Sequence, residues 1–381
     1  MNQYKMSSRI LYFDILNICS CLAVIFLHHN GIVHDFSNTA AWRESLIVEC
    51  GFYWAVPVFL MLSGANLLNY RSKYNTVTFF KKRFLRTAIP WFLWSIIMLL
   101  WQIHLGNIES YSPSYLFDLI FNYKVVPVYW FFGALFACYL AIPVFSLLCN
   151  HREILWYTVI INFIFCSCLP VLQPWFNISW NLDIPIKGSL MIYVLLGYLL
   201  STKTLKPKYR RLLYICGIGS FLFRYVYTYV FSVKNGQTDV SIKGYSIFHA
   251  VFLSVAVFEL AQNINWEKYL PQFLIKKLPF LSSCSFGIYL IHKIVMYYEL
   301  SIFHLPQQGH IWRIVFVPCT YCISLFLIYL IKKIPFIGKY LCWYQQNILI
   351  FSDYLPVSLE RQKSRKPSSL RLFLCFYANI I

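Results

Sequence analysis

A long apolar stretch near the start of the chain, residues 9–30, carries ionisable side chains at both ends. About 20 apolar residues, at roughly 1.5 Å each along a helix, are enough to cross the hydrocarbon core of a bilayer. Asp14 lies near one end of the stretch, and His28 and His29 lie at the other. At about 100° per residue, Asp14 and His28 return to within about 40° of one helix face. Ionisable residues are costly in lipid and usually face a bundle interior or a water-filled cavity. A pair of interfacial histidines at a helix end is the alternative.

Composition places the rest of the chain in a membrane as well. Only 12% of the residues are charged and 59% are hydrophobic, whereas a soluble protein averages about 25% charged residues. We therefore expect an all-α, polytopic integral membrane protein with about ten transmembrane helices. The apolar spans fall near residues 10–29, 47–68, 88–105, 127–149, 154–172, 187–201, 212–233, 245–262, 284–303 and 312–331.

The net charge of +19 follows the predicted topology. If both termini lie on one side, 25 of the 33 Lys and Arg residues fall at the termini and in the loops of that side, and four fall in the opposite loops. This asymmetry indicates cytoplasmic termini. We therefore expect a multi-pass protein of the cell (inner) membrane, with a transmembrane domain over 9–345 and a basic cytoplasmic tail over 346–381. The basic excess requires no nucleic acid partner.

The most basic loop follows the second span and includes Lys82, Arg83 and Arg86. If this segment is helical up to Pro90, Arg83 and Arg86 share a face at i, i+3. Clustered cations favour an anionic ligand, and Arg binds phosphate bidentately. A topology clamp against anionic lipid headgroups is the alternative.

Polar residues also interrupt the later spans. Ser285, Tyr289 and His292 are spaced i, i+4 and i+7, so they share one helix face, either as a polar seam between helices or as the lining of a site. Trp130 opens an aromatic cluster that could equally be an interfacial belt. Arg224 lies inside an apolar span, where an acidic partner such as Glu259 is conceivable.

In this order, the motifs resemble the membrane acyltransferase 3 family over roughly residues 9–345. The segments that carry the resemblance are Tyr12-Phe-Asp14 with His28, Val58-Phe-Leu-Met-Leu-Ser-Gly64, Phe80-Lys-Lys-Arg83 with Arg86 and Pro90, Trp130-Phe131 with Tyr139 and Pro143, and Ser285-Phe-Gly-Ile-Tyr-Leu-Ile-His292. One departure is that the family often has Arg separated from the first-span His by ten residues, where this chain has Asn17. Asn17 cannot supply a permanent charge, which puts a role for a first-span cation in doubt.

The resemblance implies transfer of an acyl group, usually acetyl, from cytoplasmic acyl-CoA to a carbohydrate hydroxyl. Typical acceptors in the family are lipopolysaccharide O-antigen, exopolysaccharide, peptidoglycan and lipid-linked sugars. The expected donor is acetyl-CoA, the expected partners are the carbohydrate and the bilayer, and no metal is expected. A polytopic transporter or flippase of lipid-linked sugars is the main alternative, and a structural membrane subunit is a third.

The candidate residues have distinct expected roles. We expect His28 to be the general base, since imidazole titrates near neutral pH, with Asp14 tuning the polar face of the first span. Tyr289 and His292 are expected to line the cavity or stabilise the oxyanion, although a covalent acyl-histidine route stays open. The expected acyl-CoA contacts are Lys82, Arg83 and Arg86, and the expected acceptor contacts are Asn17, Trp130 and Arg224.

The expected mechanism requires the imidazole of His28 and the guanidinium groups of the basic loop to share one lumen. Asp14 and His28 are separated by roughly 21 Å along the helix axis. The thioester would therefore have to reach up a channel, or the acyl group would have to be relayed across the membrane.

Overall fold

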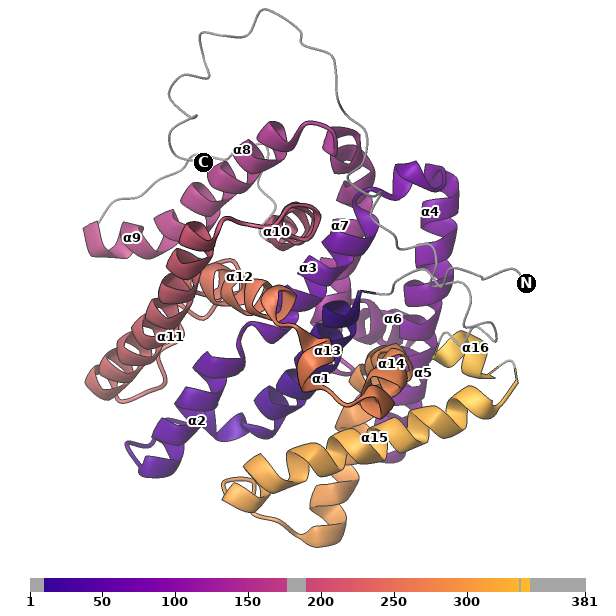
Figure 1. Cartoon of the computed structure of the whole chain (residues 1–381). Coiled ribbons are helices and arrows are strands. Elements are labelled where there is room, and N and C mark those ends of the chain that lie inside the picture. The colour runs from indigo at the N-terminus through magenta and orange to yellow at the C-terminus, as the bar shows by residue number, and fades with distance from the viewer. Residues whose placement is uncertain (1–9, 177–189, 336, 343–381) are drawn as a thin grey trace, which may run out of the picture.

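The computed structural model describes residues 10–176, 190–335 and 337–342, and within these ranges the chain forms helices and no strand. The predicted all-α class is thereby confirmed. The predicted tail, 346–381, lies outside the described residues. Figure 1 shows the arrangement of the helices. They are α1 (Leu11–His29), α2 (Ala40–Phe52), α3 (Ala55–Leu67), α4 (Thr76–Arg83), α5 (Ile89–His104), α6 (Pro113–Phe121), α7 (Trp130–Phe145), α8 (Arg152–Asn162), α9 (Leu169–Phe176), α10 (Met191–Thr202), α11 (Pro207–Asn235), α12 (Phe248–Asn263), α13 (Trp266–Tyr269), α14 (Gln272–Phe303), α15 (Phe316–Lys333) and α16 (Ile337–Leu341).

Seven helical segments are long and apolar enough to cross a bilayer, and each coincides with a predicted span. The fold is therefore that of a polytopic membrane protein. Three of these segments begin earlier than the apolar sequence indicated, because polar helical turns precede the apolar ones. The seven segments are Leu11–His29, Ala40–Ser72, Thr76–His104, Pro127–Leu148, Arg152–Gln173, Gln272–Phe303 and Ile311–Lys333.

The other three predicted spans are helical too, but they are shorter or more polar. α10 and α12 are apolar and have 12 and 16 residues. α11 has 29 residues, and Arg210, Arg211 and Arg224 interrupt its apolar sequence. About ten helical spans thus lie where ten were predicted. The side of the membrane on which the termini lie stays a prediction.

α10 lies in the centre of the bundle, where Figure 1 shows it nearly end-on. Every residue from Met191 to Leu200 is buried, as expected for a helix that is hydrophobic all round. α3 crosses it at two glycines. A Cβ on Gly64 would lie 1.8 Å from the carbonyl oxygen of Val194, and a Cβ on Gly197 would lie 1.9 Å from that of Met61. Only glycine permits so close an approach of two backbones, a packing mode common in membranes.

α1 and α14 run side by side in the same direction, as their polar contacts show. Nδ2 of Asn17 donates hydrogen bonds of 2.9 Å to the carbonyl oxygen and to the hydroxyl of Ser282. Eleven residues further along α1, a ring nitrogen of His28 lies 2.7 Å from one of His292, ten residues further along α14. Sequence numbers therefore rise together along both helices. Two predicted odd-numbered spans, the first and the ninth, accordingly cross in the same sense.

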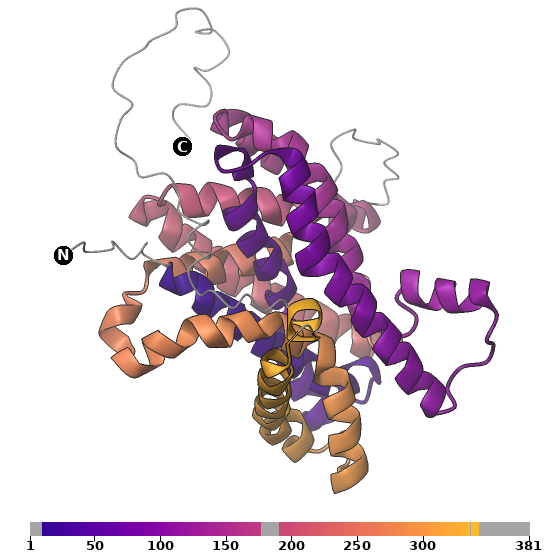
Figure 2. The same ribbon diagram turned by 90° about the vertical axis from the view of Figure 1, so that its right-hand side faces the viewer.

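α4 and α5 form one rod through a π-helical turn, Phe84–Ala88, and Figure 2 shows this rod as a long continuous helix. A π turn accommodates one extra residue per turn and often occurs at a functional site. It changes the register between Arg83, which precedes it, and Arg86, which lies inside it. The i, i+3 relation expected for a regular helix therefore does not hold across this segment.

The close crossing of α3 and α10 predicts that Gly64→Ala destabilises the protein. The added methyl group overlaps a backbone carbonyl that no rotamer change can move, so we expect a loss of about 1–3 kcal/mol and a lower melting temperature in detergent. Gly219→Ala on α11 is the matched control, because a Cβ there meets nothing within 4 Å. Equal melting temperatures for the two variants would contradict the crossing.

Candidate functional site

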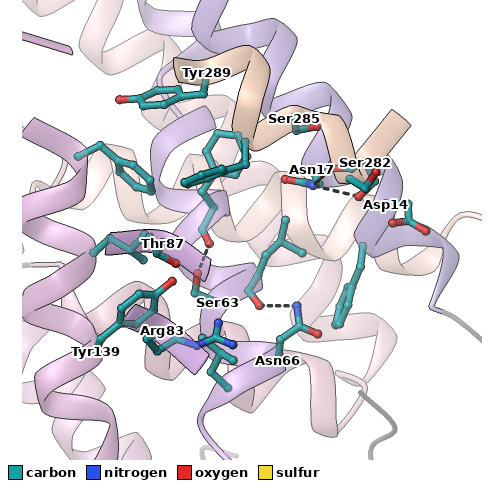
Figure 3. Close-up of a pocket in the computed structure, with 18 of the residues that line it drawn as sticks. Asp14, Asn17, Ser63, Asn66, Arg83, Thr87, Tyr139, Ser282, Ser285 and Tyr289 are labelled. Carbon is teal, nitrogen blue, oxygen red and sulfur yellow. Dashed lines mark hydrogen bonds between the residues drawn. The ribbon is translucent and has the colours of Figure 1, made fainter. Parts of the chain in front are cut away.

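A first cavity of about 300 Å³ lies between α1, α3, the α4–α5 rod, α7 and α14. This volume would hold about ten water molecules. Figure 3 shows Tyr289 towards one end of the cavity and Arg83 with Tyr139 towards the other. Its walls are largely aromatic and aliphatic, with polar groups at intervals. The polar lining residues are Asp14, Asn17, Ser63, Asn66, Arg83, Thr87, Tyr139, Ser282, Ser283, Ser285 and Tyr289.

Of the three predicted acyl-CoA contacts, only Arg83 lines this cavity. Its side chain is buried, with the guanidinium 5.7 Å from the ring centre of Tyr139. Lys82 instead places its ammonium group 4.1 Å from the ring centre of Tyr74. Arg86 lies within the π turn and is absent from the lining. The extra residue of that turn explains why the two arginines do not face the cavity together.

Asp14 and Asn17 both line the first cavity from α1. Asp14 is buried, which makes it an intramembrane carboxyl group of the kind that usually serves a site. Asn17 uses its amide to bind Ser282 of α14. Asn17, which stands in place of the arginine of the family pattern, therefore links α1 to α14 at the edge of the cavity.

The predicted polar face of α14 is both a seam and a lining. Ser285 and Tyr289 line the first cavity, and His292, one turn beyond Tyr289, contacts His28 of α1. The hydroxyl of Tyr289 donates a hydrogen bond to the carbonyl oxygen of Val128. Because a phenol has one proton to donate, Tyr289 could help an oxyanion only after releasing that carbonyl.

A second cavity, of about 290 Å³, lies where α1, α5 and the loop before α7 meet α14. His28 lines it, and so does Lys293, the residue that follows His292. Two aromatic side chains of this cavity, Trp101 and Tyr297, pack edge to face with ring centres 5.1 Å apart. Amide and imidazole groups complete the polar lining, which comprises His28, His29, Gln102, Lys293 and Gln307.

The hydrogen bonds of His292 fix the tautomer of His28. Nδ1 of His292 lies 2.7 Å from the carbonyl oxygen of Tyr289, and a carbonyl can only accept, so this nitrogen carries a proton. In a neutral ring, Nε2 of His292 is then an acceptor. The proton in its 2.7 Å contact with Nδ1 of His28 must come from His28. Nε2 of His28 is therefore unprotonated, and His28 lines the second cavity.

His29, which the sequence analysis did not select, anchors the end of α1. Its Nδ1 donates to the carbonyl oxygen of Trp312 at 3.0 Å, and its Nε2 lies 2.9 Å from the hydroxyl of Thr320. Thr320 in turn donates to the buried carboxyl group of Glu299. Both ring nitrogens of His29 are thus engaged, whereas His28 keeps one nitrogen for a ligand. The signal in the sequence was the adjacency of two histidines, which cannot point in the same direction from a helix.

The residues expected to share one lumen line two different cavities among the described residues, and a passage that joins these cavities stays a prediction. Arg83 lines the first cavity and His28 lines the second. One turn of α14, from Tyr289 to His292, lies between them. The hydroxyl of Tyr129 braces this turn by donating to the carbonyl oxygen of Leu290 at 2.7 Å. Phe131 and Phe132 of α7 pack on Tyr289 beside this turn, with ring centres 5.8 and 5.7 Å from that of Tyr289.

Arg224 pairs with Glu49 of α2 and not with Glu259. Its Nη2 lies 3.4 Å from Oε1 of Glu49, and its guanidinium lies 3.4 Å from the ring centre of Tyr53. Glu259 instead accepts a hydrogen bond from Asn263. Arg224 lines a third, small cavity of about 20 Å³, away from the two larger ones. Its predicted contact with the acceptor stays a prediction.

Trp130 lines neither large cavity. Its ring stacks on Tyr245 at 5.5 Å between centres, and Tyr245 stacks on Tyr53 at 4.2 Å. Since Tyr53 also contacts Arg224, this aromatic stack connects two of the three predicted acceptor contacts, Trp130 and Arg224. Within the described ranges, no three His, Cys, Asp or Glu side chains are grouped so as to hold a metal ion.

The tautomer of His28 can be tested by nitrogen NMR of protein with labelled histidine at mildly basic pH. We expect the signal assigned to His28 by its loss in His28→Ala to show a protonated Nδ1 and a bare Nε2. His292→Ala removes the acceptor, so this preference should disappear. A protonated Nε2 on His28 in the unmodified protein would contradict the arrangement.

A family model described as an acyltransferase domain (Acyl_transf_3) matches residues 10–344 of the chain. No curated protein and no solved structure matches it significantly.

Proposed function

The chain belongs to the acyltransferase 3 family of membrane acyltransferases, and on that premise we propose that it transfers an acetyl group from acetyl-CoA to a hydroxyl of a cell-surface or lipid-linked carbohydrate. The observation that carries this proposal is the bare Nε2 of His28, held at a cavity by His292. A sugar hydroxyl is a weak nucleophile at neutral pH, so it needs a positioned base.

The histidine pair supports the role of base. His292 holds the ring of His28 in one orientation, in the way that a second group commonly orients a catalytic base. When Nε2 of His28 takes a proton, the resulting imidazolium keeps its hydrogen bond to Nε2 of His292. His292 is thus a positioning residue in this proposal, in place of the direct role expected from the sequence.

The first cavity supports the donor site. Acetyl-CoA is polyanionic, and the α4–α5 rod, whose Arg83 lines this cavity, also carries Lys81, Lys82 and Arg86. Arg83, which lines the cavity, would bind a phosphate by charge-assisted hydrogen bonds. The aromatic walls towards Tyr289 suit the thin, largely apolar arm that ends in the thioester.

The proposed reaction balances as a single acyl transfer. Nε2 of His28 accepts the proton of the acceptor hydroxyl, and the oxygen attacks the thioester carbonyl carbon. A C–O bond forms, the C–S bond breaks, and the leaving thiolate of CoA takes the proton from His28. The products are an O-acetyl ester and free CoA, and His28 returns to its starting state.

The position of Tyr289 sets a requirement on this reaction. Tyr289 borders the donor cavity, and the next turn of α14 carries the contact with His28. The thioester must therefore pass the ring of Tyr289 to meet the acceptor. Rotation of that ring would break one hydrogen bond, to Val128, at a net cost of about 1 kcal/mol.

We expect purified protein to move label from acetyl-CoA to isolated surface glycan, and His28→Ala to lower this rate at least about 100-fold, the usual contribution of a general base. His104→Ala is the matched control, because His104 is exposed at the end of α5 and lines no cavity. Transport of a lipid-linked sugar without label in the glycan would favour the transporter alternative.

Arg83→Ala should weaken binding of acetyl-CoA about tenfold or more, since a hydrogen bond to a charged group contributes about 1.5–3 kcal/mol. Arg86→Ala should have the smaller effect, because Arg86 does not line the cavity. Lys81→Ala, an exposed cation of the same segment, is the control. Titration of the detergent-solubilised variants with acetyl-CoA measures these affinities, and an unchanged affinity in Arg83→Ala would remove the donor assignment.

A further inference from the structure

Lys293 stands out among the cations of the membrane-spanning helices. It follows His292 on α14, lines the second cavity and is only partly exposed. Its ammonium group has no hydrogen bond or ion pair within the part of the chain that the structure describes. A cation that faces a cavity in an apolar interior usually marks a ligand path or a missing counter-charge.

Three buried cations of the membrane helices are paired with protein groups. Arg313 lies 3.4 Å from Glu44 and donates to the carbonyl oxygens of Ala41 and Gln308. Arg224 has Glu49. Lys332 donates to the carbonyl oxygen and hydroxyl of Ser283 at 2.8 and 2.9 Å. Lys293 differs from these three cations, because no such partner lies beside it among the described residues.

The ammonium group of Lys293 cannot reach the polar membrane surface by extension of its side chain along the helix. Lys293 lies ten residues, or about 15 Å, before the end of α14, much further than its four-carbon stem reaches. The cavity around it has no acidic lining residue, although two histidines line it as well. The linings of both other described cavities include a carboxylate as well as a cation, Asp14 and Arg83 in the first and Glu49 and Arg224 in the third.

We propose that the second cavity takes an acidic carbohydrate, whose anionic group, a carboxylate or a phosphate, pairs with Lys293 while the reacting hydroxyl lies at Nε2 of His28. This inference rests on the proposed function, because it assigns the acceptor to the cavity of the base. Trp101 and Tyr297 offer aromatic surfaces for a sugar ring, and Gln102 and Gln307 offer amide groups for its hydroxyls.

The charge of such an acceptor also suits the proton transfer. When His28 takes the hydroxyl proton, a second positive charge appears close to Lys293, since both residues line the second cavity. Like charges close together in an apolar site repel strongly. An anion bound to Lys293 offsets this repulsion at the step where it arises. Lys293 is thus a specificity-determining residue for the acceptor.

The test compares three acceptors with the full-length protein: a uronic-acid glycan, the same glycan after reduction of its carboxyl groups, and a phosphate-bearing glycan. We expect Lys293→Gln to raise KM for the preferred acidic glycan about tenfold or more, with the KM of the neutral glycan unchanged. Lys293→Arg should restore part of the affinity. The acidic glycan with the lower KM in the unmodified protein identifies the carboxylate or the phosphate as the recognised group.

Lys124→Gln is the matched control. It removes the same charge from the loop that enters the second cavity, but the ammonium group of Lys124 is exposed and already lies 2.7 Å from Asp118. Equal effects of Lys293→Gln on acidic and neutral glycans, or an effect confined to kcat and its pH profile, would overturn the proposal. Such a result would instead make Lys293 a group that acts on His28 alone.

Binding without catalysis separates this inference from the proposed function. Titration with each glycan in the absence of acetyl-CoA should give tighter binding of an acidic glycan to the unmodified protein and loss of this preference in Lys293→Gln. Acetyl-CoA affinity and melting temperature report whether the variant is folded. Binding that prefers an acidic glycan without label transfer would refute only the acetyltransferase, whereas label transfer with no preference for an acidic glycan would refute only the role of Lys293.

Discussion

The contact between α1 and α14 is the interaction on which both large cavities depend. It is made by hydrogen bonds between polar side chains in apolar surroundings, Asn17 with Ser282 at one end and His28 with His292 at the other. Such bonds fix the rotation of each helix, because a slip of one residue would turn the polar groups by about 100° into apolar neighbours. The first bond lies at the first cavity and the second at the second cavity.

The sequence predicted the helices well because apolar length and charge asymmetry are local properties that a bilayer constrains strongly. It also placed Ser285, Tyr289 and His292 on one face, since helical spacing alone decides that. It could not supply the partner of Arg224, because Glu49 is 175 positions away and helix packing decides which carboxylate it meets. The π turn at Phe84–Ala88 carries no clear residue signature, so the different environments of Arg83 and Arg86 were hidden.

The sequence predicted which residues form the candidate site better than it predicted how these residues are arranged. His28 was predicted, but nothing in the sequence favours one of its two ring nitrogens. That choice follows from a carbonyl of α14, three residues before His292. Lys293 was not predicted as a site residue although it is a cation within an apolar span, because the candidate residue His292 directly precedes it. The division into two cavities depends on where aromatic side chains of α7 and α14 meet, which no linear pattern expresses.

The π turn contains one residue more than an α-helical turn, so it shifts the register of the α4–α5 rod by one residue. Deletion of a single residue between Phe84 and Ala88 would restore an ordinary α-helix. Everything before the deletion would then turn by about 100° and advance by about 1.5 Å relative to α5. Arg83 would leave the cavity and a neighbouring side chain would replace it. Homologous chains that differ by one residue in this turn would thus present different side chains to the same ligand, with no substitution in the lining.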